Sequence, residues 1–216
     1  MDAYKTIAPV YDAVTGAFLR KPRKMIVEAC AALKAWRVLD VGCGTGVLAA
    51  MLREGRTELV AGLDRSDAML AAGSRKNAPL PAPAVSRSGA SPAQSLFVRG
   101  DAAFPPFKPG SFDALVYALI LHETTADADA LVKAGFALAP LALILEWRMP
   151  ERNLDVLAAS WVHGIERLAG REHYRQFRAF MQTGGVRGLA LRVGARIVSE
   201  RALAGNSLVL ATLRQE

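Results

Sequence analysis

The sequence predicts an α/β fold, in which helices pack on both faces of a doubly wound, mostly parallel sheet. Short apolar runs alternate with helical stretches along most of the 216 residues, which favours βαβ units. The first apolar run leads into a glycine-rich turn, and the second ends in an acidic residue. Because a sheet of this kind occupies about the length of this chain, we expect residues 1–216 to form a single domain.

Seven apolar runs predict strands, and the stretches between them predict helices. The strands are expected at residues 37–41, 59–63, 96–99, 112–117, 141–146, 195–199 and 207–211. The helices are expected at residues 21–35, 46–53, 68–72 and 126–136, with further helix between residues 153 and 192. Residues 1–35 are expected to form N-terminal cover helices, and residues 150–191 a helical insertion between strands five and six that covers a ligand site. Residues 73–95, rich in Pro, Ala and Ser without periodicity, predict a mobile loop.

Composition and charge exclude several classes of protein. The 52% content of hydrophobic residues is too high for a disordered chain. Cys30 and Cys43 are too few for a disulfide framework, which favours a reducing, cytoplasmic setting. The apolar stretch 134–145 is shorter than the ~20 residues of a membrane span, and residues 1–20 lack a signal-peptide pattern. The net charge of +7 gathers in residues 20–37 and 151–216; a solvated basic face is the favoured interpretation, and contact with an anionic membrane or nucleic acid is the alternative.

The glycine-rich turn follows the first predicted strand. Residues 38–46 read Val-Leu-Asp-Val-Gly-Cys-Gly-Thr-Gly, with glycines at positions 42, 44 and 46. Glycines at such a strand-to-helix turn permit unusual dihedral angles and let a ligand lie against the backbone. The spacing differs from the G-x-G-x-x-G dinucleotide fingerprint, and the turn lacks the lysine of a P-loop.

Acidic residues follow the next two predicted strands. Asp64 ends the second strand, where a carboxylate is suited to accept two hydrogen bonds from a ribose diol. Asp101 follows the third strand, and residues 110–117 (Gly-Ser-Phe-Asp-Ala-Leu-Val-Tyr) predict a loop that runs into a buried fourth strand.

In order and spacing, these four segments resemble the class I S-adenosylmethionine-dependent methyltransferases. The resemblance covers residues 7–148 well and residues 195–213 more weakly. The opening run 8–12 (Ala-Pro-Val-Tyr-Asp), together with Pro106-Phe107 and the run 110–113, is similar to the ubiquinone/menaquinone-biosynthesis type. The resemblance implies a Rossmann-like seven-stranded sheet that is mostly parallel, with an antiparallel last strand.

The resemblance also implies S-adenosylmethionine as cofactor, with S-adenosylhomocysteine as product. It places the three glycines at the methionine portion, with Asp40 ordering their loop and holding the amino group. It places Asp64 at the ribose hydroxyls and Arg65 beside the adenine, whose edge would contact Asp101 and the backbone amide of Ala102. The residues expected to bind the cofactor are Tyr11, Asp40, Gly42, Cys43, Gly44, Gly46, Asp64, Arg65, Asp101 and Ala102. Tyr11 would close over the cofactor, or would pack in the core as an ordinary aromatic residue.

Candidate acceptor-site residues follow the fourth and fifth strands. His122 would act as a base for a hydroxyl acceptor because its pKa lies near neutrality, or would only form a local hydrogen bond. Trp147 and Arg148 would line the acceptor pocket or pack on the surface. No metal is expected, because the spacing of His163, Glu166 and His173 matches no metal-ligand motif.

The chemistry of methyl transfer depends mainly on alignment, so the sequence defines the cofactor better than the acceptor. We expect a small organic acceptor that is aromatic, quinone-like or lipid-like, and no specific nucleic acid partner. The alternatives are methylation of RNA or protein through the basic surface, or a regulatory protein that binds the cofactor without turnover. Both a monomer and a homodimer remain compatible with the sequence.

Overall fold

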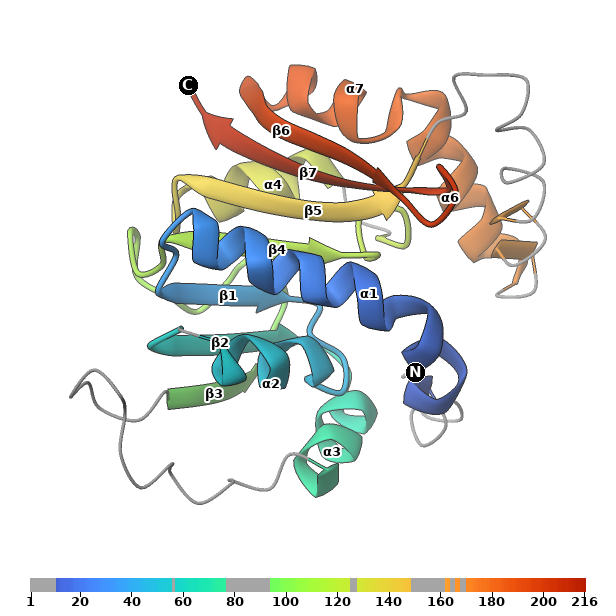
Figure 1. Ribbon diagram of the computed structural model, residues 1–216. Coiled ribbons are helices and arrows are strands. Elements are labelled where there is room, and N and C mark those ends of the chain that lie inside the picture. Colours follow the sequence, from blue (N-terminus) through green and yellow to red (C-terminus); the bar gives the residue numbers. More distant parts are fainter. Residues whose placement is uncertain are drawn as a thin grey trace.

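A seven-stranded sheet forms the centre of the computed structural model (Figure 1). The structure describes residues 11–55, 57–76, 94–124, 128–148, 162–163, 166–167 and 170–216. The strands are β1 (Arg37–Val41), β2 (Leu59–Asp64), β3 (Gln94–Arg99), β4 (Ala114–Ala118), β5 (Leu141–Trp147), β6 (Ala195–Leu203) and β7 (Leu208–Gln215). Their order is β3-β2-β1-β4-β5-β7-β6. The first five run parallel and β7 is antiparallel to both of its neighbours, which confirms the predicted fold class.

Helices cover both faces of the sheet. They are α1 (Tyr11–Ala32), α2 (Val47–Glu54), α3 (Asp67–Lys76), α4 (Ala128–Phe136), α6 (Arg171–Gln182) and α7 (Gly185–Arg192). Figure 1 shows α1 and α2 on one face and α4 and α7 on the other. Successive side chains of β1 point to opposite faces, so Val38 packs in the core under α1 and α2, whereas Leu39 packs in the core under α4 and α7. Cover on both faces explains why the central strands are continuously apolar instead of alternating.

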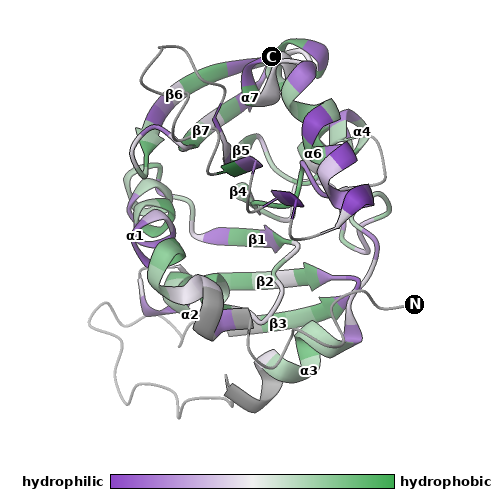
Figure 2. Cartoon of the chain, turned by 90° about the vertical axis from the view of Figure 1, so that its right-hand side faces the viewer, coloured by the Kyte–Doolittle hydropathy of each residue, from purple (hydrophilic) through white to green (hydrophobic). Residues whose placement is uncertain are grey.

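The hydropathy of the elements follows this layering. Figure 2 shows hydrophobic residues along β1, β2 and β3, and hydrophilic residues along much of α6. Helix α6 buries only Phe177 and Phe180 from its sequence REHYRQFRAFMQ. Among the residues that the structure describes, no helix has the length and hydropathy that crossing a bilayer requires.

Several boundaries differ from the sequence-based prediction. Helix α1 starts ten residues earlier than position 21 and runs through Pro22, although proline removes one backbone hydrogen bond. Burial of Leu19 and a hydrogen bond from Thr45 Oγ1 to Asp12 Oδ1 (2.7 Å) hold the turns before the proline. Strand β4 starts at residue 114 instead of 112, because the preceding Asp113 turns its carboxylate to the start of β1.

Two predicted segments lie partly outside the described residues. Helix α3 continues to Lys76, past residue 73 where the mobile loop is predicted to begin, and the rest of that predicted loop at 77–93 lies outside the described residues. Of the predicted cover at 150–191, α6 and α7 are its main described part, while residues 149–161, 164–165 and 168–169 lie outside it.

Candidate cofactor and acceptor site

The glycine loop lies between β1 and α2, at the carboxyl end of the sheet. Gly42, Gly44 and Gly46 have φ values of 69°, 54° and 75°, a region that L side chains rarely adopt. A Cβ at Gly42 would lie 2.6 Å from Ile120 Cγ2, so a side chain is excluded there by packing. A Cβ at Gly44 would meet nothing within 4 Å, which leaves the backbone open to a ligand.

Asp64 fixes this loop from the end of β2. Its Oδ2 accepts a hydrogen bond from the Gly44 amide (2.8 Å), and its Oδ1 accepts one from the Ser66 amide (2.8 Å). A carboxylate has about four acceptor positions, so both oxygens keep the capacity to accept hydroxyl groups. The residue predicted to bind the ribose therefore also shapes the loop that would bind the methionine portion.

Asp40 supplies a buried carboxyl group beneath the loop. The residue is 2% exposed, and its Oδ2 has no hydrogen-bond partner among the described residues. Burial raises the pKa of Asp40 to about 7, with Arg23 opposing the increase and Asp64 adding to it. An unpartnered buried acceptor is costly, and an ammonium group beside it would supply the missing donor. The site thus fits the amino group of S-adenosylmethionine.

One cavity joins most of the predicted cofactor residues. Its lining includes Asp40, Gly42, Cys43, Gly44, Asp64, Arg65, Asp101 and Ala102. Gly46 lies outside this lining and forms the N-cap of α2. Tyr11 is the first residue of α1, and its side chain lies outside what the structure describes. The tertiary structure therefore brings the glycine loop and three strand ends together, as the motifs predict.

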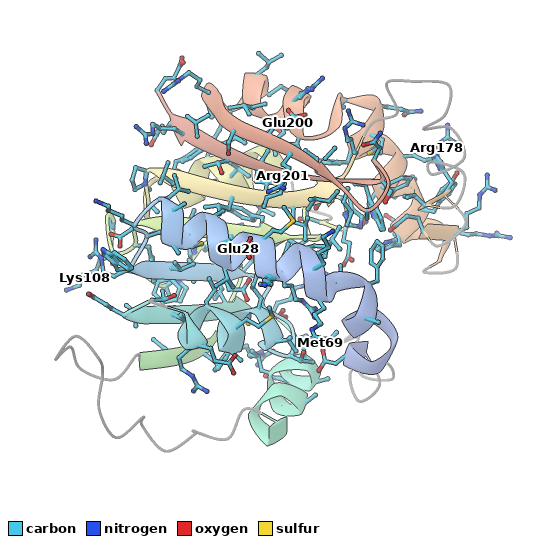
Figure 3. The ribbon with its side chains drawn as sticks, viewed as in Figure 1. Glu28, Met69, Lys108, Arg178, Glu200 and Arg201 are labelled. Atoms are coloured by element: carbon cyan, nitrogen blue, oxygen red, sulfur yellow. The ribbon has the colours of Figure 1, made fainter. Side chains whose placement is uncertain are left out.

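The cavity also contains residues that the sequence reasoning missed. Leu19 and Arg23 enter it from α1, and Met69 enters it from the first turn of α3, where Figure 3 labels it. Ile120 and Glu123 line it from the turn after β4. Leu19, Arg23 and Met69 belong to no sequence motif, whereas Ile120 and Glu123 flank His122 in the run after the fourth predicted strand.

Two acids of the family pattern have different surroundings. Asp101 is exposed at the cavity and accepts a hydrogen bond on Oδ1 from the Ala103 amide (2.9 Å). Asp113 lies elsewhere: its Oδ1 accepts from Arg37 Nη2 (2.8 Å) and its Oδ2 from the Trp36 and Arg37 amides (2.9 and 2.8 Å). Burial alone would raise the pKa of Asp113, but the hydrogen bonds from Arg37 and Trp36 outweigh it and lower the pKa. Asp113 thus acts as a structural clamp between β1 and β4.

His122 occupies the turn after β4, where the sequence predicts the acceptor site. The imidazole is 2% exposed, and His122 is not among the residues that line the cavity, whereas the adjacent Glu123 is. Its Nδ1 lies 2.6 Å from Oε2 of Glu146, a side chain with 0% exposure. Glu146 Oε1 accepts in turn from the Leu121 amide (2.8 Å). Since a carboxylate can only accept here, Nδ1 of His122 carries a proton.

Further charged groups surround the same imidazole. Burial would lower the pKa of His122, but Glu146, Glu123 and Glu166 outweigh it and raise the pKa to about 9.

Trp147 does not line the cavity; its Nε1 donates to Glu166 Oε1 (2.7 Å), and its ring packs 6.2 Å from that of Phe18. Arg148 also lies outside the cavity lining.

Comparisons with known proteins agree with this geometry. A family model described as a methyltransferase domain matches residues 38–140. A demethylmenaquinone methyltransferase of Renibacterium salmoninarum is 31% identical over 135 residues, which cover 60% of this chain and 50% of that protein. The chain thus matches about half the length of this curated relative.

Solved structures share the fold at lower identity. Magnesium protoporphyrin IX methyltransferase from Synechocystis, solved with bound S-adenosylhomocysteine, superposes with a TM-score of 0.61 at 21% identity, covering 90% of this chain and 83% of that one. The methyltransferase domain of bacterial CtHen1-CN has a TM-score of 0.64 at 16% identity, covering 90% and 98%. Mitomycin 7-O-methyltransferase has a TM-score of 0.60 at 17% identity, covering 85% and 50%.

Residues 38–140 match a methyltransferase domain, and the fold and the glycine loop are similar to those of the class I S-adenosylmethionine-dependent methyltransferases. This result confirms the resemblance found in the sequence. Within the class, its similarity at 31% identity is to a demethylmenaquinone methyltransferase.

Proposed function

We propose that this protein transfers the methyl group of S-adenosylmethionine to a small organic acceptor of aromatic, quinone-like or lipid-like character. The observation that carries the proposal is a single cavity with two kinds of lining. Polar groups for a cofactor lie on the side of β1 and β2, and apolar side chains, including Leu119, Ile120 and Leu145, lie on the side of β4 and β5. The demethylmenaquinone relative supports a quinone-like acceptor.

The residues of the cavity divide the work of binding. Asp40 holds the amino group of the cofactor, Arg23 supplies positive charge for its carboxylate, and Asp64 accepts from the ribose hydroxyls. When bound, S-adenosylmethionine supplies a methyl group already activated on a sulfonium. The chain therefore needs mainly to align the acceptor and to exclude water, for which apolar lining is suited.

The test is transfer of a labelled methyl group by the purified full chain. Cell extract is separated into organic-soluble small molecules, RNA and protein, and each fraction is incubated with the protein and methyl-labelled S-adenosylmethionine. We expect label in the organic-soluble fraction. Label confined to RNA or protein would overturn the proposed acceptor class, and a chain that binds no S-adenosylmethionine by calorimetry would overturn the proposed activity.

His122 is proposed to assist the acceptor through its neighbour Glu123, since the imidazole itself does not line the cavity. We expect His122→Asn to lower turnover at saturating S-adenosylmethionine, while the Kd for the cofactor changes less than about threefold. The two readouts are steady-state methyl transfer and calorimetry. Unchanged turnover in a folded variant would leave His122 with a purely local, structural role.

A further inference from the structure

Two imidazoles and three carboxylates meet beside the acceptor end of the cavity. His122 and Glu123 come from the turn after β4, Glu146 from β5, and His173 from α6. Glu166 completes the cluster and, like His122 and Glu146, is buried. We propose that His122, Glu123 and His173 bind a divalent transition-metal ion, with Glu146 and Glu166 supporting the two imidazoles.

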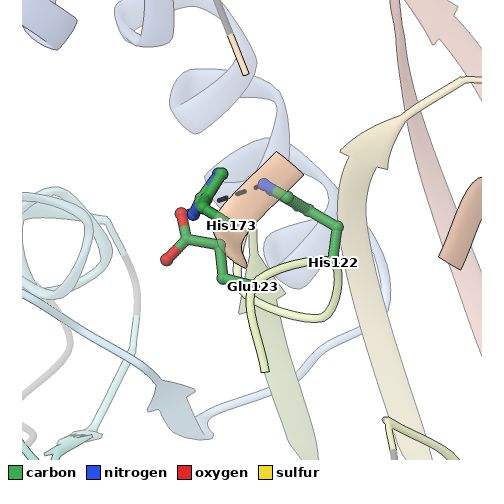
Figure 4. A group of neighbouring side chains, drawn as sticks. All are labelled: His122, Glu123 and His173. Atoms are coloured by element: carbon green, nitrogen blue, oxygen red, sulfur yellow. Dashed lines mark ion pairs between the residues drawn. The ribbon is translucent and has the colours of Figure 1, made fainter. Parts of the chain in front are cut away.

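The three proposed ligands already lie close together. One ligand atom from each residue lies within 4.8 Å of the others, and His122 Nε2 lies 3.8 Å from Glu123 Oε1 (Figure 4). Metal–ligand bonds of about 2.0–2.2 Å bring neighbouring ligand atoms to roughly 3–3.5 Å. The most distant ligand atoms must therefore approach by roughly 1.3–1.8 Å, which rotation of side chains on a turn and on a helix would supply.

Hydrogen bonds prepare both imidazoles for this role. Glu146 holds Nδ1 of His122 at 2.6 Å, which leaves Nε2, facing Glu123 at 3.8 Å and Glu166 at 3.7 Å, as the nitrogen that would bind the ion once its proton is released. Glu166 holds Nε2 of His173 at 2.5 Å and is itself fixed by the indole of Trp147. Metal-binding histidines commonly have one ring nitrogen held by a carboxylate in this way, because the contact fixes the tautomer and the ring orientation.

The donor set determines the class of ion. Two imidazoles and one carboxylate favour borderline ions such as Zn²⁺ or Fe²⁺ and can also hold the harder Mn²⁺, whereas Mg²⁺ favours oxygen ligands only. The three carboxylates outnumber the two imidazoles, so the cluster keeps a net negative charge that attracts a cation even when both imidazoles are protonated. Three protein ligands also leave at least one coordination position for a further oxygen ligand.

The position of Glu123 connects the proposed metal to the acceptor. Glu123 belongs both to the ligand set and to the cavity lining. If the proposed methyl transfer holds, an acceptor hydroxyl that occupies the open coordination position would lose its proton to solvent more readily. Its oxygen would then form the new O–CH₃ bond as the S–CH₃ bond of the cofactor breaks. His122 would serve as a ligand in this arrangement, and not as a base.

Metal binding is tested on the full chain after removal of metals with a chelator. Calorimetric titration with ZnCl₂ and with MnCl₂ is expected to show one ion bound per chain, and MgCl₂ is expected to bind much more weakly. His173→Ala and Glu123→Gln should each weaken binding by at least the roughly 10- to 100-fold that loss of a supporting carboxylate costs. Circular dichroism verifies that both variants fold.

The matched control is His163→Ala. His163 is another partly buried imidazole near the cluster, with Nδ1 3.0 Å from Tyr174 Oη, and it lies outside the proposed ligand set. Its substitution should leave metal affinity unchanged. The proposal fails if the wild-type chain binds none of these ions, or if His173→Ala and Glu123→Gln bind them as tightly as wild type. Calorimetry with S-adenosylmethionine separates the two proposals, since either ligand can bind without the other.

Discussion

Asp40 is the single residue whose ionisation should depend most on the bound cofactor. Its carboxyl is buried, has one unpartnered oxygen among the described residues, and has a pKa of about 7. Arg23 lowers this pKa and Asp64 raises it, but burial dominates. A neighbouring ammonium favours the ionised form, so cofactor binding and loss of this proton are coupled.

We therefore expect the affinity for S-adenosylmethionine to increase as the pH rises from about 6 to about 8. Below the pKa a proton must leave Asp40 before the ammonium can pair with it, which weakens binding by up to roughly tenfold per pH unit. Calorimetry at several pH values measures the effect. Asp40→Asn should bind more weakly and should retain only the titration of the cofactor's own amino group. An identical pH profile in wild type and variant would contradict this role.

The same shift affects the stability of the free protein with the opposite sign. Because the folded-state pKa of Asp40 lies above its ordinary value of 3.8, the group binds more protons in the folded state between these values. Its contribution to stability is thus retained below about pH 4 and is lost as the pH rises through about 7. Above about pH 7 the free site therefore holds a buried carboxylate that Arg23 compensates only in part.

At the scale of the elements, Asp113 joins the starts of two adjacent strands. It accepts hydrogen bonds from the side chain of Arg37 and from two backbone amides at the start of β1, while β4 begins one residue after it. The Arg37 and Asp113 side chains are 45% and 29% exposed, so solvent screens part of their attraction. The hydrogen bonds from the Trp36 and Arg37 amides to Asp113 are additional to this ion pair, and an ordinary surface ion pair has no such bonds.

We expect Asp113→Ala to lower the free energy of unfolding by about 1–2 kcal/mol, because two amides and a guanidinium lose their acceptor. Chemical denaturation with urea measures the change. Asp67→Ala is the matched control, since Asp67 also pairs with an arginine, Arg99 at 3.1 Å, but has a side chain 68% exposed. Because the pKa of Asp113 is lowered in the folded state, its carboxylate loses its stabilising effect as it becomes protonated. The difference in unfolding free energy between wild type and Asp113→Ala should therefore shrink as the pH falls below about 4. Equal effects of the two substitutions would refute the clamp.

Helix α1 is the element that links the glycine loop to the wall of the cavity. Its first turn contacts the glycine loop through Asp12 and Thr45, and its later residues Leu19 and Arg23 line the cavity. The helix that precedes β1 thus forms one wall of the cavity, in addition to covering the sheet.

At the scale of the whole molecule, the cavity draws residues from α1, α2, α3 and the ends of the first five strands or the loops after them. A ligand that binds there contacts elements on both faces of the sheet, so its binding energy adds to global stability. S-adenosylhomocysteine at about 100 times its Kd is expected to add about 2.7 kcal/mol. For a chain of this length that corresponds to an increase in Tm of roughly 5–10 °C.

Thermal unfolding with and without S-adenosylhomocysteine tests this expectation. Asp64→Asn should reduce the ligand-induced increase in Tm. The asparagine side chain has only one oxygen, so it cannot accept from the Gly44 and Ser66 amides on two separate oxygens as the carboxylate does. Asp67→Asn, three residues further on, should retain it. A ligand-induced shift of equal size in the Asp64→Asn variant would show that Asp64 does not contribute to binding.

The surplus of basic residues is partly neutralised by ion pairs in the folded molecule. Several arginines of the C-terminal third pair with acids, including Arg187 with Glu200 at 2.9 Å and Arg192 with Asp129 at 2.7 Å. Such pairing reduces the charge available to a polyanion and agrees with the interpretation of a solvated face.

Local sequence signals were enough to predict the sheet and the residues proposed to bind the cofactor. Apolar runs, the glycine turn at 42–46, and the acids Asp40, Asp64 and Asp101 are local signals, because each reflects the backbone and side-chain chemistry of one short segment. Parallel strands then carry these signals to one edge of the sheet, so their meeting could be predicted without coordinates. The role of Asp113 was beyond such signals, because its partners lie 76 and 77 residues away.

The surroundings of His122, in contrast, depend on contacts between distant segments. Its contacts with Glu146, Glu166 and His173 join the turn after β4 to β5 and α6, at sequence separations that no motif spans. The same holds for Leu19, Arg23 and Met69, whose place in the cavity depends on how α1 and α3 pack. Local chemistry specifies what each segment can do, whereas the packing of distant segments specifies which of those groups act together.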